Sequence, residues 1–267
     1  SIPLGINGFI TSVISTFSTL LLPRRLVVAG FTYSNALALI GRFSGMALTV
    51  VYLPYIAVNS MLIVLIPDLS IKINSKDSWA IENRIMQVIK ISILVGIATG
   101  VVCLSIPDIL GQLFFKRSDL EEMIKFAALA GFTNYVASPS FGILNALGKQ
   151  QILLRNSVLV ALEELALIYF LTSIPNLNIY GYGICIMISS ITAFYLNITE
   201  ISKDFEIQFQ VSEIITFVVI AILAFLLVNL LYPLPFAGSL RKTAIGWPLS
   251  NPKTCLPNTM KGERATR

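Results

Sequence analysis

The chain has 267 residues, of which 55% are hydrophobic and 12% charged, and its formal net charge is +5. This composition excludes an ordinary soluble globular domain, in which about a quarter of the residues are charged. Histidine is absent, and Cys103, Cys185 and Cys255 stand alone without CxxC spacing, so we expect no catalytic triad, metal site, cofactor or disulfide framework, and no enzyme.

Apolar runs long enough to cross a bilayer follow one another through most of the chain. A membrane-spanning helix needs about 20 mostly apolar residues, and backbone groups inside hydrocarbon must pair within their own segment. The runs are too uniformly apolar for barrel strands. The sequence therefore predicts an all-α polytopic membrane protein, with about seven transmembrane helices in one bundle over residues 1–237. The predicted spans are residues 4–22, 43–66, 88–110, 126–147, 152–174, 184–199 and 214–232.

Residues 238–267 lack the apolar pattern and carry six basic residues against the single acid Glu263, which equals the +5 of the whole chain. The remaining residues are neutral overall, so the charge does not point to nucleic acid. We expect a disordered or out-of-frame tail, with a polybasic segment that binds anionic lipid as the alternative. The chain begins at Ser1 without a signal-peptide pattern, and we interpret it as a fragment.

Lysine and arginine placement gives the expected orientation. Alternate loops carry six such residues against five in the others, and this small excess places the loop of residues 72–84 in the cytoplasm. We expect a multi-pass protein of the cytoplasmic membrane.

Arg42 is the first candidate for a functional residue. It stands at the start of the second predicted span beside Gly41, Ser44 and Gly45, whose small side chains let a ligand or helix approach. Ionisable residues at membrane depth are typical of substrate or ion pathways. The alternative is an arginine whose side chain extends to the membrane interface.

Prolines and asparagines recur in the second and fourth predicted spans. Pro54 and Pro139 predict kinks that free backbone carbonyls, and Asn59, Asn134 and Asn145 place amides at membrane depth. Two kinked polar spans are typical of helices that line a transporter pathway, so we interpret the asparagines as candidate substrate-binding residues. Static kinks filled by packing are the alternative.

Glu163 and Glu164 lie near the middle of the fifth predicted span. Adjacent residues of a helix point about 100° apart, so at least one of the two faces the bundle interior or water. They are candidate proton or cation sites, or they line an aqueous cavity without a role in transport.

Several segments carry a resemblance to a known family. The chain resembles the stage V sporulation protein B group of the polysaccharide-transporter family, in the multidrug/oligosaccharidyl-lipid/polysaccharide exporter superfamily, from Ser1 to about residue 235. The matching segments are PRRL at 23–26, AG at 29–30, NALAL at 35–39, GR at 41–42, GMAL at 45–48, Pro54, LIP at 65–67, GILNALGK at 142–149, IP at 174–175 and IYG at 179–181.

The resemblance implies two helical bundles around a cavity that opens alternately to the two sides of the membrane, this chain being the second half without its last span. It implies a flippase for an oligosaccharide or peptidoglycan precursor linked to undecaprenyl diphosphate, in spore cortex or envelope biogenesis. In related lipid II flippases of the MurJ type, cavity arginines hold the diphosphate, and Arg42 falls where one is expected. Glu164 departs from the pattern, because relatives often have a basic residue there.

Two other classes share part of this pattern. An ion-coupled multidrug exporter of the same superfamily would have the same architecture. A membrane-embedded sugar transferase would need a large outward loop with catalytic residues, and we rank it last because the loops are short. The sequence has no ATP-binding motif, so we expect an ion gradient, the membrane potential or a substrate gradient to supply the energy.

Overall fold

The computed structural model describes residues 2–74, 78–205 and 211–231, which are helical without any strand. The all-α fold class predicted from the sequence is confirmed. The predicted tail of residues 238–267 lies outside the described residues. The helices are α1 (Ile2–Val28), α2 (Tyr33–Ile40), the π-helix η1 (Gly41–Ala47), α3 (Leu48–Tyr52), α4 (Tyr55–Asn74), α5 (Ser78–Ser105), α6 (Pro107–Phe115), α7 (Glu121–Ala146), α8 (Gln150–Leu171), α9 (Asn178–Ile201) and α10 (Val211–Leu231).

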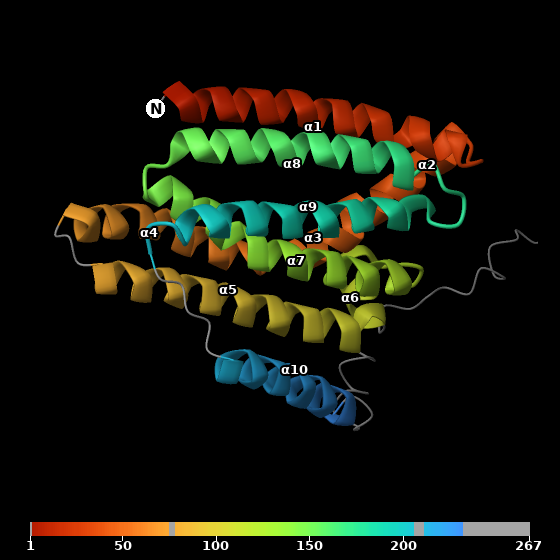
Figure 1. Ribbon diagram of the computed structural model, residues 1–267. Helices are drawn as coiled ribbons and strands as arrows, with labels where there is room; N and C mark the ends of the chain where they lie inside the picture. Colours follow the sequence, from red (N-terminus) through yellow and green to blue (C-terminus); the bar gives the residue numbers. More distant parts are fainter. Residues whose placement is uncertain (1, 75–77, 206–210, 232–267) are drawn as a thin grey trace, which may run out of the picture.

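The long helices lie side by side, with α7 in the middle of the bundle (Figure 1). Helix α7 packs against α9, α5 and α4, while α1 packs on α8 and α10 packs on α5. Ile124, Ala130, Tyr135 and Leu144 of α7 are fully buried. Buried residues recur along α7 from Ile124 to Ala146, which fits its central position.

The outer surface is suited to lipid. Phe9, Ile63 and Leu230 are each at least 70% exposed, and many other large apolar side chains point outward. A soluble monomer rarely shows so much apolar surface. Among the residues that the structure describes, three segments combine the length and the apolarity of a membrane span: Tyr33–Tyr52, Ser78–Ser105 and Asn178–Ile201. The count of seven spans remains a prediction.

The second predicted span is longer than expected and is interrupted. Its helical part begins at Tyr33, where the Thr32 hydroxyl caps the first turn by accepting a hydrogen bond from the backbone N–H of Asn35 at 3.3 Å. It continues through the π-helix and breaks at Leu53 and Pro54, before α4 begins. The helical segment therefore begins ten residues before the predicted start of the span at residue 43. The apolar pattern does not contain this start, because neither a cap nor a π-helix is part of it.

The break at Pro54 is compensated by a side chain from α7. Proline has no backbone N–H and ends the regular hydrogen-bond ladder. The hydroxyl of Tyr135, which is fully buried, donates to the carbonyl of Val51 at 2.9 Å, one turn before the break. Helix α7, in contrast, runs without interruption through Pro139.

Glycines allow α3 and α5 to approach α7 closely. A Cβ atom built on Gly131 would lie 2.3 Å from Cγ1 of Val51, and one on Gly96 would lie 2.9 Å from Cβ of Tyr135. Small residues at helix crossings are typical of membrane bundles. These two glycines bring Tyr135 within reach of the Val51 carbonyl.

Candidate functional site

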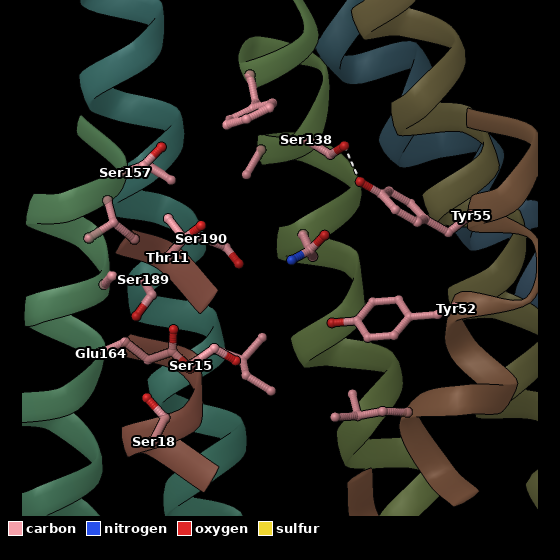
Figure 2. A pocket seen from close by; sticks show the side chains of 18 of the residues that line it. Thr11, Ser15, Ser18, Tyr52, Tyr55, Ser138, Ser157, Glu164, Ser189 and Ser190 are labelled. Atoms are coloured by element: carbon pink, nitrogen blue, oxygen red, sulfur yellow. Dashed lines mark hydrogen bonds between the residues drawn. The ribbon is translucent and has the colours of Figure 1, made fainter. Parts of the chain in front are cut away.

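A cavity of about 1030 Å³ lies between α1, η1, α3, α4, α7, α8 and α9. One wall consists of α1, α8 and α9, and the other consists of α3, α4 and α7 (Figure 2). Most of its polar lining consists of hydroxyl and amide side chains. These are Thr11, Ser15, Ser18, Ser44, Thr49, Tyr52, Tyr55, Asn59, Asn134, Ser138, Asn156, Ser157, Tyr182, Ser189, Ser190 and Asn197.

The cavity has an unusual charge pattern. Glu164 is the one charged side chain among the described residues that line it, and neither lysine nor arginine occurs in that set. The lining can therefore accept and donate many hydrogen bonds, but it offers no positive charge to an anion.

Much of the hydrogen-bonding capacity of the lining is available to a ligand. Within the described part of the chain, the side-chain amides of Asn59 and Asn134 make no hydrogen bond, and the buried hydroxyl oxygen of Ser189 has no partner. Other lining groups are paired with each other, as Tyr55 is with Ser138. Asn59 is exposed to the cavity and Asn134 is half-buried, so their amides are open to a ligand, and the unpaired Ser189 hydroxyl would gain a hydrogen bond from one.

The structure brings together some of the residues predicted from the sequence. Asn59 of α4, Asn134 of α7 and Glu164 of α8 all line the cavity, although they are far apart in the chain. Asn145 does not line it. Glu163 points elsewhere and accepts a hydrogen bond from the Thr192 hydroxyl at 3.0 Å, in the contact between α8 and α9. One of the two adjacent glutamates thus faces the cavity.

Arg42 lies outside the cavity lining. Its guanidinium is 3.3 Å from a carboxylate oxygen of Asp119, in the turn between α6 and α7, and its side chain is 37% exposed. Arg117 donates two hydrogen bonds of 2.9 Å to the same carboxylate. These bonds hold the pKa of Asp119 below its usual value, so Asp119 stays charged and bound to both arginines.

A polar network, which the sequence did not predict, connects three helices beside the cavity. Asn197 of α9 donates to the Ser140 hydroxyl of α7 at 3.2 Å, and Asn156 of α8 donates to Asn197 at 3.0 Å. All three side chains are buried. Asn156 and Asn197 also line the cavity, so the network fixes one part of its wall.

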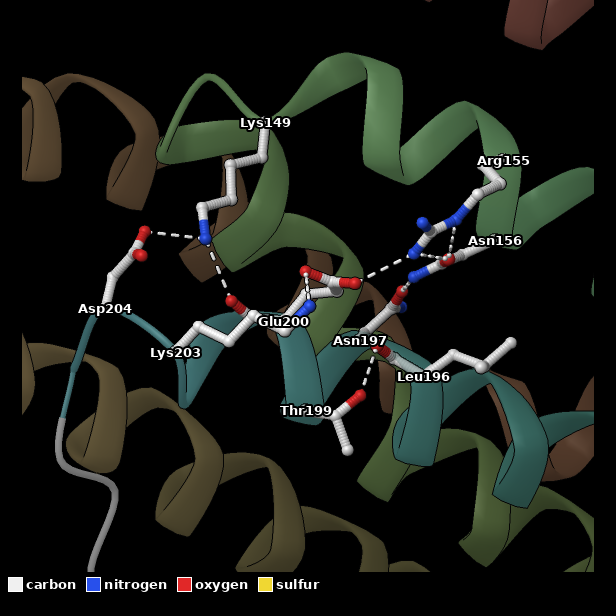
Figure 3. Close-up of polar contacts among 9 residues, drawn as sticks. All are labelled: Lys149, Arg155, Asn156, Leu196, Asn197, Thr199, Glu200, Lys203 and Asp204. Atoms are coloured by element: carbon white, nitrogen blue, oxygen red, sulfur yellow. Dashed lines mark hydrogen bonds and ion pairs between the residues drawn. The ribbon is translucent and has the colours of Figure 1, made fainter.

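Ion pairs extend this network (Figure 3). Glu200 binds Arg155 at 2.8 Å and Lys203 at 2.9 Å. Lys149, at the start of α8, donates to the Glu200 carbonyl at 2.8 Å and pairs with Asp204 at 2.6 Å. The ion pairs therefore join the first turns of α8 to the end of α9.

The hydroxyl lining of α1 was also missed, although the sequence contains a signal for it. Thr11, Ser15 and Ser18 are spaced by four and three residues, which places them on one face of a helix. Tyr52 and Tyr182 gave no such signal, since aromatic residues in apolar runs are usually part of the core.

The fold and the cavity define an all-helical membrane protein with a polar cavity between its helices. The chain is 25% identical over 248 residues to stage V sporulation protein B of Bacillus subtilis (strain 168), a match that covers 92% of this chain. This similarity confirms the resemblance to the stage V sporulation protein B group that the sequence predicted. The chain spans about half the length of this curated relative, since the match covers 48% of it. No family model matches the chain, and no solved structure matches it.

Proposed function

We propose that this chain is one bundle of a membrane transporter that moves a lipid-linked oligosaccharide or cell-wall precursor across the cytoplasmic membrane by alternating access. The observation that carries the proposal is the cavity lined by hydroxyl and amide groups inside a bundle with an apolar surface. A sugar head group is too polar to enter hydrocarbon without compensating hydrogen bonds, and such a lining supplies them. The lipid tail remains in the bilayer during the movement.

The similarity to stage V sporulation protein B supports this function in an indirect way. The name of that relative refers to sporulation, and a spore needs new envelope polysaccharide, so we propose spore cortex or envelope biogenesis as the setting. Because the chain corresponds to about half of the relative, we propose that a second bundle completes the pathway. The chain alone should then insert into a membrane without transporting.

A flippase assay tests the proposal with the polypeptide encoded by the complete gene. It is reconstituted in liposomes with an undecaprenyl-diphosphate oligosaccharide whose sugar carries a fluorophore, and external dithionite bleaches the molecules that reach the outer leaflet. We expect bleaching to approach completion with the protein and to stop at the outer-leaflet fraction without it.

Matched variants connect the result to the cavity. Asn134→Leu removes an amide that lines the cavity and should slow bleaching at least several-fold. Asn176→Leu removes an exposed amide in the turn before α9 and should have no effect. Transport of a cationic dye without movement of the lipid-linked sugar would contradict the proposal and favour the multidrug exporter, for which the Glu164 carboxylate would be the suitable charge.

A further inference from the structure

We infer that the cavity binds the uncharged, polyhydroxyl part of the substrate around Glu164, and that the phosphates of the substrate lie outside it. This inference rests on the proposed function and specifies which part of the lipid-linked sugar the site takes. It differs from the expectation based on the sequence, in which Arg42 holds the diphosphate inside the cavity.

The charges that this chain contributes to the lining do not suit a phosphate ligand. Phosphate recognition in proteins relies on arginine, lysine or clustered backbone amides, and the described lining residues include no basic side chain. Glu164 is acidic and offers no attraction to an anion. Arg42, which could supply the opposite charge, is bound to Asp119 away from the lining.

The hydrogen-bonding groups match sugar hydroxyls instead. A sugar hydroxyl both donates and accepts, as do the serine hydroxyls and asparagine amides of the lining, while a carboxylate accepts from two hydroxyls at once. Figure 2 shows Glu164 of α8, Ser15 of α1 and Ser189 of α9 on one wall, with Tyr52 on the facing wall. The Ser189 hydroxyl is buried without a partner among the described residues, and a ligand hydroxyl beside it would complete its hydrogen bonding.

Shape supports the same class of ligand. Tyrosine offers an apolar ring face and a polar hydroxyl, which suits a sugar ring with C–H faces and hydroxyl edges. The cavity volume of about 1030 Å³ lies just above the range of about 300–1,000 Å³ for small-molecule sites. The site therefore has room for more than one sugar ring.

Binding measurements on the polypeptide of the complete gene, purified in nanodiscs, test the inference. The probes are a soluble neutral N-acetylglucosamine tetramer and inorganic pyrophosphate. Isothermal titration calorimetry measures the affinity of each. We expect the tetramer to bind and millimolar pyrophosphate not to displace it. Glu164→Gln should weaken tetramer binding about tenfold, because it replaces a carboxyl oxygen that accepts from sugar hydroxyls with an amide NH₂ group that cannot accept.

Glu163→Gln is the matched control, since Glu163 neighbours Glu164 but contacts Thr192 outside the cavity, and its affinity for the tetramer should equal that of the unmodified protein. Glu164→Arg should create pyrophosphate binding that competes with the tetramer. Gel filtration of each variant shows that a change in affinity is not a loss of folding.

Competition by pyrophosphate in the unmodified protein, or equal effects of Glu163→Gln and Glu164→Gln, would overturn the inference. The flippase assay distinguishes its failure from that of the proposed function. Transport together with pyrophosphate competition means that only the inference fails. Tetramer binding that depends on Glu164 but without transport means that the flippase function fails and the sugar site stands.

Discussion

Replacing Tyr135 by phenylalanine tests how the interrupted second span is held to α7. The substitution removes the hydroxyl that donates to the Val51 carbonyl at 2.9 Å and leaves the ring in its fully buried place. The carbonyl then has no donor, because the ladder ends at Pro54 and water does not reach a fully buried site.

The expected loss of stability follows from this geometry. A buried acceptor left without a partner costs about 1–3 kcal/mol, whereas hydrogen bonds between membrane helices contribute about 0.6 kcal/mol on average and up to about 1.7 kcal/mol. We expect about 1.5 kcal/mol for Tyr135→Phe, at the upper end of the membrane range, because the proline break prevents the carbonyl from finding another donor in its own helix. This corresponds to about a tenfold shift of the unfolding equilibrium.

Unfolding in mixed micelles of increasing sodium dodecyl sulfate fraction, followed by circular dichroism, measures the effect. Tyr180→Phe is the matched control, since Tyr180 packs edge-to-face on Phe126 and its hydroxyl makes no hydrogen bond among the described residues. If Tyr135→Phe and Tyr180→Phe changed stability by the same amount, the Val51 carbonyl would not depend on Tyr135 and the reasoning would be refuted.

Three further predictions concern packing, the polar network and topology. Gly131→Ala should destabilise the protein by about 1–3 kcal/mol, since its Cβ would lie 2.3 Å from Val51, whereas Gly100→Ala, with nothing within 4 Å, should be neutral or slightly stabilising in the same unfolding assay. Glu200→Gln should lower the thermal midpoint measured by fluorescence-detected gel filtration, because both ion pairs of Glu200 are lost; an unchanged midpoint would show that the network does not hold α8 to α9. A cysteine at position 149 should react with a membrane-impermeant maleimide only after the cytoplasmic side is opened, whereas a cysteine at position 176 should react from outside. The reverse pattern would overturn the predicted orientation.

The sequence by itself determined the helical membrane class and the family resemblance. Both depend on local features. The apolar runs are long enough to span a membrane and must then be helical, and the resemblance depends on short motifs such as the one around Arg42. The helix break at Pro54 could also be predicted, because the missing backbone N–H is a property of proline and does not depend on its neighbours.

The composition of the cavity required the tertiary structure. Glu163 and Glu164 are chemically equal in the sequence, and only the packing of α8 between α1 and α9 turns Glu164 to the cavity and Glu163 to Thr192. From the sequence, Arg42 could bind either a substrate or an acidic side chain of another segment. In the structure it pairs with Asp119, which lies 77 residues later in the chain. Such partners are set by the rotation of each helix and by contacts between distant segments, which no local pattern encodes.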